Sequence, residues 1–465
     1  MEVCGLAFDS RKVKAGDAYF ALRGEKQDGH EHIAEAVENG AVCVICEHIP
    51  KVEIPYVLSP DTHEALSFAA SAWYGEPSQT IRVVGVTGTN GKTTTTYLLR
   101  ELLRQCTGEK VGLIGTNGNE IDGVFLPTSR TTPDALSVQK LLFEMVQAGC
   151  RYAVMEVSSH ALCQKRVAAV SFAVGIFTNL TRDHLDYHGT MEAYAAAKAT
   201  LFSLCRYAVI NVDDAWGRKM IAACPCPYLT FGQNITCDIV AWRTQYAPDG
   251  VSFTVSDDEE HCPTGIPIPG EFSLYNALGV LAAAKLLGVP LAAAAAYLPQ
   301  CHGVCGRCEI VHRGDVTVMI DYAHTPDGLR NILTAVSGIA DERVITVFGC
   351  GGDRDRGKRA EMGRIAAAFS DFCVLTSDNP RTENPYVILH DVLGGMAKSE
   401  TAFAVVENRR EAIHFALHTA RRGDVVLLAG KGHETYQTVG KENRPMDERQ
   451  IVWQYYAARS QVDGD

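Results

Sequence analysis

The chain has 465 residues, of which 46% are hydrophobic and 21% are charged, and its formal net charge is −12 at pH 7. This composition excludes a disordered or fibrous protein, and the length predicts two to four globular domains. The acidic balance argues against a dedicated nucleic-acid-binding or anionic-membrane surface, so we expect small molecules as partners.

We expect a cytoplasmic protein, because the sequence shows neither a secretory signal nor a transmembrane stretch. The first residues lack the basic region, apolar run and small-residue cleavage site of a secretory signal. No apolar stretch has transmembrane length, so we expect no membrane insertion. The 16 cysteines are therefore expected to be reduced thiols. Two cysteine clusters, at 224–226 and 301–308, lack a second pair at zinc-ribbon spacing, so no zinc is expected.

Changes of pattern predict three domains, at residues 1–80, 81–302 and 303–465. The first alternates short apolar runs with amphipathic stretches, as a small α/β domain does. The second opens with a strand at 81–86, a glycine-rich loop and a helix. It continues with buried strands at 152–157, 173–177 and 207–212, and with a hairpin around Asp249 and Gly250.

The third domain contains strand patterns at 316–320, 343–348, 372–376, 402–406 and 424–429. Helix-length segments separate them, which is typical of a Rossmann-like domain. The predicted fold class is therefore α/β, with a small N-terminal domain, a central parallel-sheet domain carrying a P-loop, and a Rossmann-like C-terminal domain.

The segment TGTNGKTT at 87–94 predicts a phosphate-binding loop, because it lies between a predicted strand and a predicted helix. Lys92 would neutralise the terminal phosphates, and Thr93 would contact Mg²⁺. The strict motif spacing is not met, since Val86 stands where the first glycine is expected. The loop alone leaves GTPases, kinases, transporter ATPases and ligases open.

Metal-binding candidates follow the next two predicted strands. Glu156 ends one strand, and His184 lies in the polar segment after the other. A hard cation that bridges phosphates prefers oxygen ligands such as a carboxylate, and a histidine nitrogen is an unusual addition. We expect a structural role for the neighbouring His188.

Seven segments together resemble the Mur ligases. They are GTNGKTT at 88–94, EVSSH at 156–160, FTNLTRDHLDYHGTMEAYAAAK at 177–198, DYAHTPD at 321–327, FGCGGDRDRGKR at 348–359, DNPR at 378–381 and AGKGHETYQ at 429–437. The resemblance implies ATP-dependent ligation of meso-2,6-diaminopimelate to the D-glutamate γ-carboxylate of UDP-N-acetylmuramoyl-L-alanyl-D-glutamate, through an acyl phosphate, in peptidoglycan synthesis. It implies ATP and Mg²⁺ as cofactors and these two small molecules as partners, and we expect a monomer.

The resemblance also assigns roles to individual residues. Catalytic roles fall on Lys92, Lys198 and His184. The ATP site comprises Gly88, Thr89, Asn90, Gly91, Lys92, Thr93, Thr94, Asn276, Arg307 and Asp321. Contacts to the UDP-muramoyl peptide fall on Ser10, Thr131, Thr132, Ser158, Gln164 and Arg166. The diaminopimelate site comprises Arg354, Asp378, Asn379, Pro380, Arg381, Gly430 and Glu434. The metal ligands are Thr93, Glu156, His184 and a carbamylated Lys198. The chain departs from the family at Arg130, where many relatives have asparagine.

Lys198 admits two interpretations. A lysine on an alanine-rich helix is normally solvated. The resemblance implies instead that CO₂ carbamylates Lys198, which turns a cation into a carboxylate-like ligand beside Mg²⁺.

The choice of amino acid depends on Arg381 and Glu434. Diaminopimelate differs from lysine by a distal carboxylate, which a guanidinium holds through two parallel hydrogen bonds, and Glu434 would suit the distal ammonium. The DNPR segment read alone could equally be a polar turn stiffened by Pro380. The alternatives are the lysine-adding homologue, a ligase of the folylpolyglutamate synthetase type, and, from another class, a P-loop regulatory ATPase.

Overall fold

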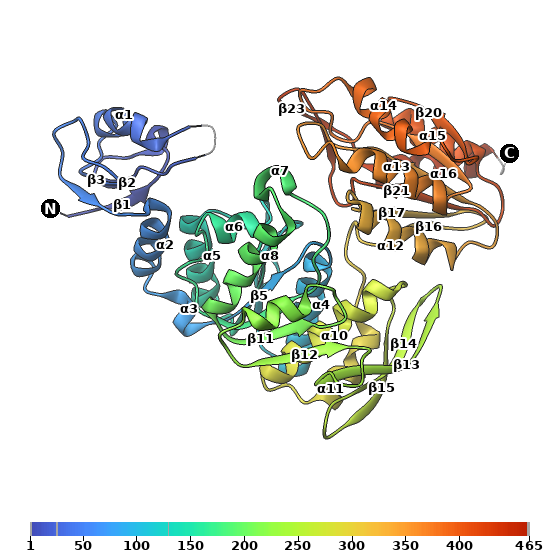
Figure 1. Cartoon of the computed structure of the whole chain (residues 1–465), viewed down its shortest axis with the longest axis horizontal. Coiled ribbons are helices and arrows are strands. Elements are labelled where there is room, and N and C mark those ends of the chain that lie inside the picture. Colours follow the sequence, from blue (N-terminus) through green and yellow to red (C-terminus); the bar gives the residue numbers. More distant parts are fainter. Residues whose placement is uncertain (1, 25–26, 129, 463–465) are drawn as a thin grey trace.

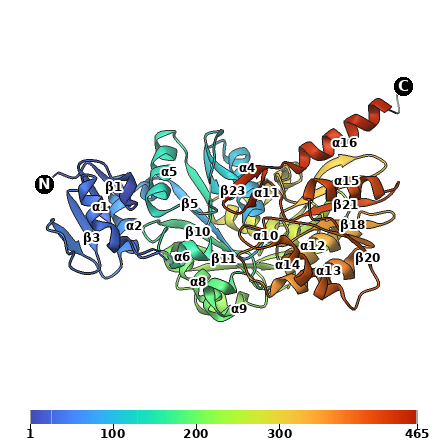
Figure 2. The same ribbon diagram turned by 90° about the horizontal axis from the view of Figure 1, so that it is seen from above.

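The computed structural model describes residues 2–24, 27–128 and 130–462. The chain forms three lobes in a row, with the N-terminal and C-terminal lobes on either side of a larger central one (Figures 1 and 2). None of the helices in the described part of the chain combines the length and apolar composition that a membrane crossing needs.

The N-terminal lobe contains a parallel sheet with strands in sequence order, β1 (Gly5–Ala7), β2 (Asp17–Phe20), β3 (Cys43–Cys46) and β4 (Tyr56–Leu58). Tyr19 and Val44 are buried in its core. Its helical segments are η1 (Ser10–Lys12), η2 (Gly29–His32), α1 (Ile33–Glu38) and α2 (Thr62–Trp73), and α3 (Pro77–Thr80) leads into the central lobe.

The central sheet has strand order β15-β14-β13-β12-β11-β10-β5-β9-β6-β7-β8 over the described residues. Its middle strands pair in parallel, and the hairpin expected around Asp249 and Gly250 is formed by β13 and β14. The strands are β5 (Arg82–Thr87), β6 (Val111–Gly115), β7 (Gly118–Ile121), β8 (Val124–Leu126), β9 (Tyr152–Glu156), β10 (Phe172–Phe177), β11 (Cys205–Asn211), β12 (Tyr228–Gly232), β13 (Ile239–Ala247), β14 (Gly250–Ser256) and β15 (His261–Ile266).

Helices cover both faces of this sheet, because its strands are apolar on both sides. Leu98 of α4 and Leu278 of α10 belong to the core cluster on one face, and Leu142 of α5 belongs to the cluster on the other. The helical segments are α4 (Lys92–Thr107), α5 (Ala135–Gln147), α6 (Ser159–Cys163), α7 (Leu185–His188), α8 (Met191–Ala199), η3 (Thr200–Leu204), α9 (Gly217–Ala222), α10 (Glu271–Leu286), α11 (Leu291–Tyr297) and η4 (Leu298–Gln300).

The C-terminal sheet has strand order β16-β17-β21-β18-β19-β20, with only β16 antiparallel to its neighbour among these strands. The strands are β16 (Glu309–Arg313), β17 (Thr317–Asp321), β18 (Val344–Phe348), β19 (Phe372–Leu375), β20 (Ala402–Val405) and β21 (Val425–Ala429), followed by the hairpin of β22 (Tyr436–Val439) and β23 (Glu442–Pro445). The helices are α12 (Pro326–Ser337), α13 (Lys358–Phe369), α14 (Pro385–Met396), α15 (Arg409–Thr419) and α16 (Glu448–Val462).

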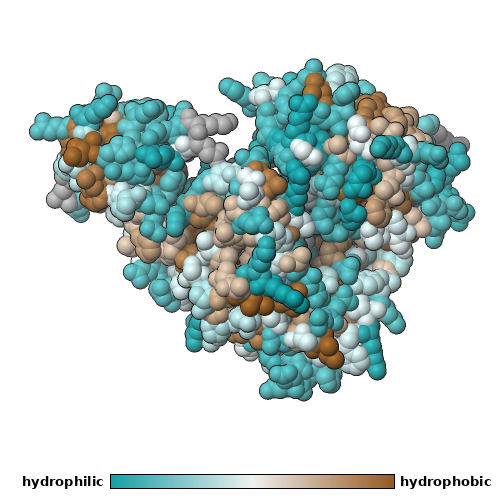
Figure 3. All heavy atoms as spheres, in the orientation of Figure 1, coloured by the Kyte–Doolittle hydropathy of each residue, from teal (hydrophilic) through white to brown (hydrophobic). Residues whose placement is uncertain are grey.

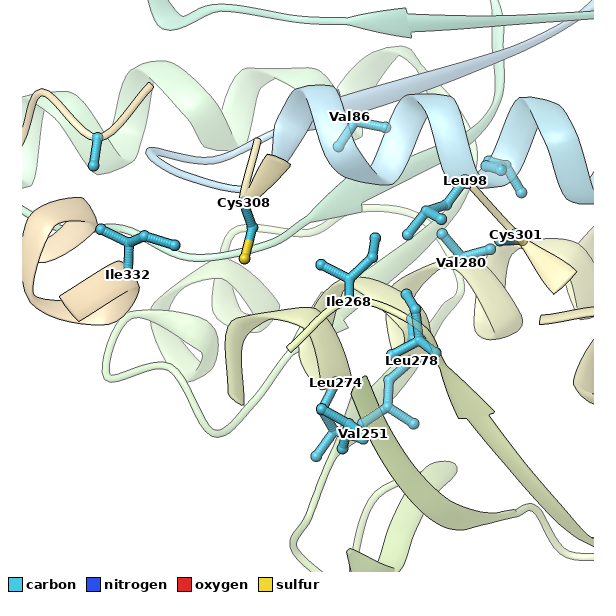
Figure 4. Packing of buried hydrophobic residues seen from close by; sticks show 14 of the residues in the cluster. Val86, Leu98, Val251, Ile268, Leu274, Leu278, Val280, Cys301, Cys308 and Ile332 are labelled. Atoms are coloured by element: carbon cyan, nitrogen blue, oxygen red, sulfur yellow. The ribbon is translucent and has the colours of Figure 1, made fainter. Parts of the chain in front are cut away.

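One hydrophobic core joins the central and C-terminal lobes. Figure 4 shows Leu98, Leu278 and Ile268 of the central lobe in the same cluster as Cys308 and Ile332, which lie beyond the predicted boundary at residue 302. The contact between these two lobes is therefore partly apolar.

The predicted fold class is confirmed, and each predicted strand lies within two residues of an observed one. The patterns did not indicate β7 and β8, among others, because the GNEI segment of β7 has no apolar run and the VFL segment of β8 is only three residues long. The cysteines are free thiols in the structure, and the sulfur atoms of Cys224 and Cys226 lie 3.6 Å apart. The expected absence of zinc stays a prediction.

Candidate active site

A cavity of about 930 Å³ is lined by residues of the central and C-terminal lobes. The face of the molecule in Figure 3 is hollowed between the outer lobes, with mostly hydrophilic residues around the hollow. The cavity lining follows the carboxyl ends of β5, β9, β17 and β21, where open α/β sheets bind ligands.

Most of the residues named from sequence line this cavity. They are Thr89, Asn90, Gly91, Lys92, Thr93, Thr94, Thr131, Thr132, Glu156, Ser158, Arg166, His184, Asn276, Arg307, Asp321, Arg354, Asp378, Asn379, Arg381, Gly430 and Glu434. Five of the named residues do not: Ser10, Gly88, Gln164, Lys198 and Pro380.

The loop between β5 and α4 requires glycine at two positions. Gly88 has φ 152°, and a Cβ there would lie 1.9 Å from Oγ1 of Thr178. Gly91 has φ 86° and caps α4, and a Cβ there would lie 2.4 Å from Oδ1 of Asn276. The loop therefore packs closely against two other segments and leaves the N-terminus of α4 facing the cavity, as in phosphate-binding loops.

The side chain of Lys92 folds back onto the phosphate loop and hydrogen-bonds to its backbone. Its Nζ donates to the carbonyl oxygens of Gly88, at 2.9 Å, and Thr89, at 2.8 Å. Burial lowers the pKa of Lys92, while the charges of Glu156 and Asp183 oppose that shift. The side chain is thus held at the loop, where phosphate oxygens could replace the carbonyl groups as its partners.

Glu156 lies at the centre of a hydroxyl-rich cluster. Its two carboxylate oxygens accept from Oγ1 of Thr93, at 3.0 and 3.1 Å. They also accept from the backbone N–H of Thr116, at 2.7 Å, and from its hydroxyl, at 3.0 Å. Nη2 of Arg307 donates to Oγ1 of Thr93 at 3.0 Å. Arg307 thus reaches from the C-terminal lobe to the first turn of α4.

Lys198 is buried, with 1% of its surface exposed, so the solvated interpretation is wrong. Its Nζ donates to the carbonyl oxygen of Gly88 at 2.8 Å and lies 4.6 Å from the centre of the Tyr194 ring. Burial, aided by the nearby charge of Lys92, lowers the pKa of Lys198 far below its ordinary value. The helix α8 therefore turns this lysine inward, against the phosphate loop.

His184 has φ 54° and begins the short helix α7. Its ring makes an edge contact with His160, at 4.8 Å between centroids, and its backbone N–H donates to Oδ1 of Asp183 at 2.9 Å. Burial lowers the pKa of His184 to about 3, so the ring is neutral at pH 7 and can offer a lone pair. His188 stacks on Tyr194 and hydrogen-bonds Ser159 at 2.9 Å, which is consistent with a structural role.

The residues named for the muramoyl peptide divide between two places. Oγ1 of Thr132 donates to the carbonyl oxygen of Glu156 at 2.8 Å, and Nη1 of Arg166 donates to the carbonyl oxygen of Thr132. Burial and the charge of Arg130 lower the pKa of Arg166, so two cations adjoin this wall. Ser10 lies in the N-terminal lobe, where its hydroxyl donates to Glu35 at 2.6 Å.

The DNPR segment and the segment after β21 form the C-terminal wall. Arg381 has φ 50°, and its Nη1 donates to the carbonyl oxygen of Gly352 at 2.7 Å. Burial and the neighbouring charge of Arg354 lower the pKa of Arg381. No carboxylate of the described residues forms an ion pair with Arg381, so its charge is available to an anionic ligand.

The residues that the sequence analysis missed include two that line the cavity, Thr116 and Lys358, and one behind its wall, Lys431. Thr116 belongs to none of the motifs, so no local signal marked it. Lys358 lies within the quoted segment at 348–359, and its Nζ is 3.8 Å from Oδ1 of Asp183 across the lobe boundary. Lys431 lies between two residues that were named, and its side chain is fully buried. The signal for both lysines was their place inside a motif.

Three family models match the chain: the Mur ligase family catalytic domain at residues 2–74, the Mur ligase middle domain at 86–284, and the Mur ligase glutamate ligase domain at 306–432. The chain therefore belongs to the Mur ligase family.

Its relatives specify the type of ligase that it resembles. The UDP-N-acetylmuramoyl-L-alanyl-D-glutamate--2,6-diaminopimelate ligase of Syntrophomonas wolfei is 43% identical, over 97% of this chain and 94% of that protein. A solved structure of a ligase with the same name is 34% identical, with a TM-score of 0.71 over 98% of this chain and 95% of that one. The MurF ligase of Thermotoga maritima, solved in complex with ADP, shares the fold at 21% identity, with a TM-score of 0.64 over 91% of this chain and 93% of that one.

Proposed function

We propose that the protein is the ATP-dependent ligase that adds meso-2,6-diaminopimelate to the D-glutamate of UDP-N-acetylmuramoyl-L-alanyl-D-glutamate in peptidoglycan synthesis. The observation that carries the proposal is a single cavity lined both by a phosphate-binding loop and by an acid- and arginine-bearing wall suited to a diamino acid. We propose further that it acts as a monomer, since residues of one chain line the cavity, and that it acts in the cytoplasm, where ATP is available.

ATP would bind with its phosphates on the loop of Gly88 to Thr94. The backbone N–H groups at the start of α4 and the Lys92 ammonium would hold the β- and γ-phosphates. Asn276, Arg307 and Asp321 would contact the rest of the nucleotide. Arg307 already reaches Thr93, so the C-terminal lobe can supply a cation at the phosphates.

The residues present fit Mg²⁺. Thr93 and Glu156 offer hydroxyl and carboxylate oxygens within hydrogen-bond distance of each other, the donor set that Mg²⁺ prefers. His184 is neutral at pH 7 and lines the same cavity. When bound, the ion would neutralise charge on the transferring phosphoryl group.

Lys198 fits a carbamate. Only a neutral amine reacts with CO₂, in a step that forms an N–C bond and releases one proton, and the burial that lowers the pKa of Lys198 well below its ordinary value favours that neutral form. The product would carry a negative charge beside Lys92, whose own positive charge disfavours the ammonium form of Lys198.

The reaction would proceed in two transfers. An oxygen of the D-glutamate γ-carboxylate attacks the γ-phosphorus of ATP, ADP leaves, and an acyl phosphate remains. The amine of diaminopimelate then attacks the acyl carbon, phosphate leaves, and the amine loses a proton. The protein would contribute mainly by positioning, with Thr131, Thr132, Ser158, Gln164 and Arg166 on the muramoyl peptide and cations at the phosphates. Ser10 would contact the uridine end of the substrate.

Arg381 supplies the test of amino-acid choice. We expect the purified protein to form product and release ADP with meso-diaminopimelate, and to use L-lysine and L-ornithine poorly, since neither offers Arg381 a distal carboxylate. Arg381→Ala should lose most of this preference, because a desolvated charge pair typically contributes about 2–5 kcal/mol. The measurement is kcat/KM for each amino acid by ADP release and by mass of the nucleotide product.

The exposed Arg364 on α13 provides a control, and Arg364→Ala should keep the wild-type preference. Equal or better use of L-lysine by the wild type would refute the diaminopimelate assignment but leave a ligase. ADP release that needs neither acceptor would favour the regulatory ATPase instead.

A further inference from the structure

Lys431 is a buried cation directly behind the C-terminal wall of the cavity. It follows β21, and none of its surface is exposed. The glycines on either side hold its backbone against neighbouring segments: a Cβ on Gly430 would lie 2.5 Å from Oδ2 of Asp378, and one on Gly432 would lie 2.7 Å from Cβ of Tyr322. Lys431 does not line the cavity, so it cannot contact the substrate in this arrangement.

The ammonium of Lys431 contacts two residues that do line the cavity. Its Nζ donates to Oδ1 of Asn379 at 2.8 Å and forms an ion pair with Oε2 of Glu434. Because Oδ1 of Asn379 also accepts from the backbone N–H of Thr438, at 2.8 Å, the amide orientation is fixed. Nδ2 of Asn379 must then point to Oε2 of Glu434, which it does at 3.0 Å.

These contacts leave the two oxygens of Glu434 in different situations. Oε2 accepts from both Lys431 and Asn379, whereas Oε1 has a long contact of 3.5 Å from the Tyr322 hydroxyl. A carboxylate oxygen can accept more than one hydrogen bond, so Oε1 retains capacity for a donor from the cavity. A substrate ammonium is such a donor.

We propose that Lys431 is a positioning residue for amino-acid specificity: it fixes the Asn379 amide and the Glu434 carboxylate so that Oε1 of Glu434 receives the distal ammonium of the diamino acid. This inference rests on the proposed function. It assigns the two distal groups of the substrate to separate parts of the wall, the ammonium to the Lys431–Asn379–Glu434 unit and the carboxylate to Arg381.

Two substrate analogues distinguish recognition of the distal ammonium from recognition of the distal carboxylate. L-Lysine keeps the distal ammonium and lacks the distal carboxylate, and 2-aminopimelate keeps the carboxylate and lacks the ammonium. In Lys431→Met, an unbranched replacement of similar length, we expect KM for meso-diaminopimelate to rise at least tenfold. The preference for diaminopimelate over 2-aminopimelate should fall at least tenfold, while the preference over L-lysine stays within about threefold of wild type.

Arg381→Ala should give the opposite pattern, with the preference over L-lysine lost and the preference over 2-aminopimelate retained. KM for ATP and for the UDP-muramoyl dipeptide should stay at wild-type values in Lys431→Met. Lys431→Gln, which keeps a hydrogen-bond donor without the charge, provides a second folded variant if the methionine replacement does not express, and should show the same selective change.

The control is Arg343→Met, which removes an ion pair with the buried Asp424 in the same lobe. Both residues precede their strands, β18 and β21, at the opposite end of the sheet from Lys431. If loss of lobe stability were the cause, this variant would change the two preferences as Lys431→Met does. We expect it to change neither.

An unchanged preference over 2-aminopimelate in folded Lys431 variants would overturn the inference, and so would equal loss of both preferences. Failure of the proposed function is distinguishable, because the wild type would then form no product with diaminopimelate.

Discussion

The structure reverses the interpretation of Lys198 that its local sequence favours. On an alanine-rich helix, it has the local sequence of a solvated lysine. In the fold it is buried against Gly88 and Tyr194, with a strongly lowered pKa. Burying a lysine with one hydrogen bond from its amine to a carbonyl oxygen is costly, so a chemical role is the better explanation.

We predict that Lys198→Ala folds but loses at least a hundredfold of its ligase activity, since the metal ligand that a carbamate on Lys198 would supply is removed. Alanine is the most favourable residue in a helix, so α8 should persist. ADP release measures activity and circular dichroism measures folding. Lys219→Ala, at an exposed lysine of α9, is the matched control and should be fully active.

A ¹³C carbamate signal from wild-type protein in ¹³CO₂ that is absent from Lys198→Ala would identify the modification. Full activity of Lys198→Ala would show that Lys198 has no catalytic role.

At the scale of elements, the C-terminal sheet and two helices are joined by a buried ion pair. Arg409 at the start of α15 contacts Glu448 at the start of α16 at 2.8 Å, and neither side chain is exposed. Nη2 of Arg409 also donates to the carbonyl oxygen of Ala429, at the end of β21 and next to Gly430 of the cavity wall. This contact fixes the end of β21 from behind.

We expect Arg409→Met to destabilise the protein by about 3–5 kcal/mol, because it leaves the carboxylate of Glu448 buried without its partner. The double variant Arg409→Met/Glu448→Leu should recover most of the loss, since an apolar pair can replace a buried ion pair at little cost. Calorimetric unfolding measures both. Arg410→Met, at the exposed neighbour, should leave stability within about 0.5 kcal/mol of wild type. A double variant as unstable as the single one would contradict this explanation.

At the scale of the whole molecule, the active site depends on contact between two lobes. The shared core brings the C-terminal lobe against α4, and polar contacts follow, with Arg307 on Thr93 and Asn90 on Asp327 at 3.0 Å each. Lys358 lies near Asp183 across the same boundary. The phosphate loop is thus covered by residues more than 200 positions away in the chain.

Arg307→Ala should raise KM for ATP about tenfold or more and lower kcat, because the C-terminal lobe then lacks its cation at the phosphates; a tenfold change corresponds to about 1.4 kcal/mol. Initial rates against ATP concentration measure this effect. Arg313→Ala, at the exposed end of β16, is the control. If both variants had wild-type KM for ATP, Arg307 would have no role at the nucleotide.

The sequence alone determined the fold class, most strands of the central and C-terminal sheets, the phosphate loop and the family. These features depend on sequence patterns within short segments: apolar runs, glycines at fixed spacing and motifs made of a few neighbouring residues. The sequence pattern did not reveal the strand β7, whose residues GNEI form no apolar run and which pairs with β6 and β8 in the folded chain.

Only the tertiary structure decided which side chains meet. Four features of the site join segments that lie apart in the chain or turn a side chain inward. They are the burial of Lys198, the contact of Arg307 with Thr93, the contact of Thr116 with Glu156, and the position of Lys431 behind Asn379 and Glu434. Burial, pKa and hydrogen-bond partners are properties of that packing, because they depend on which strands lie side by side and on how two lobes close over one loop.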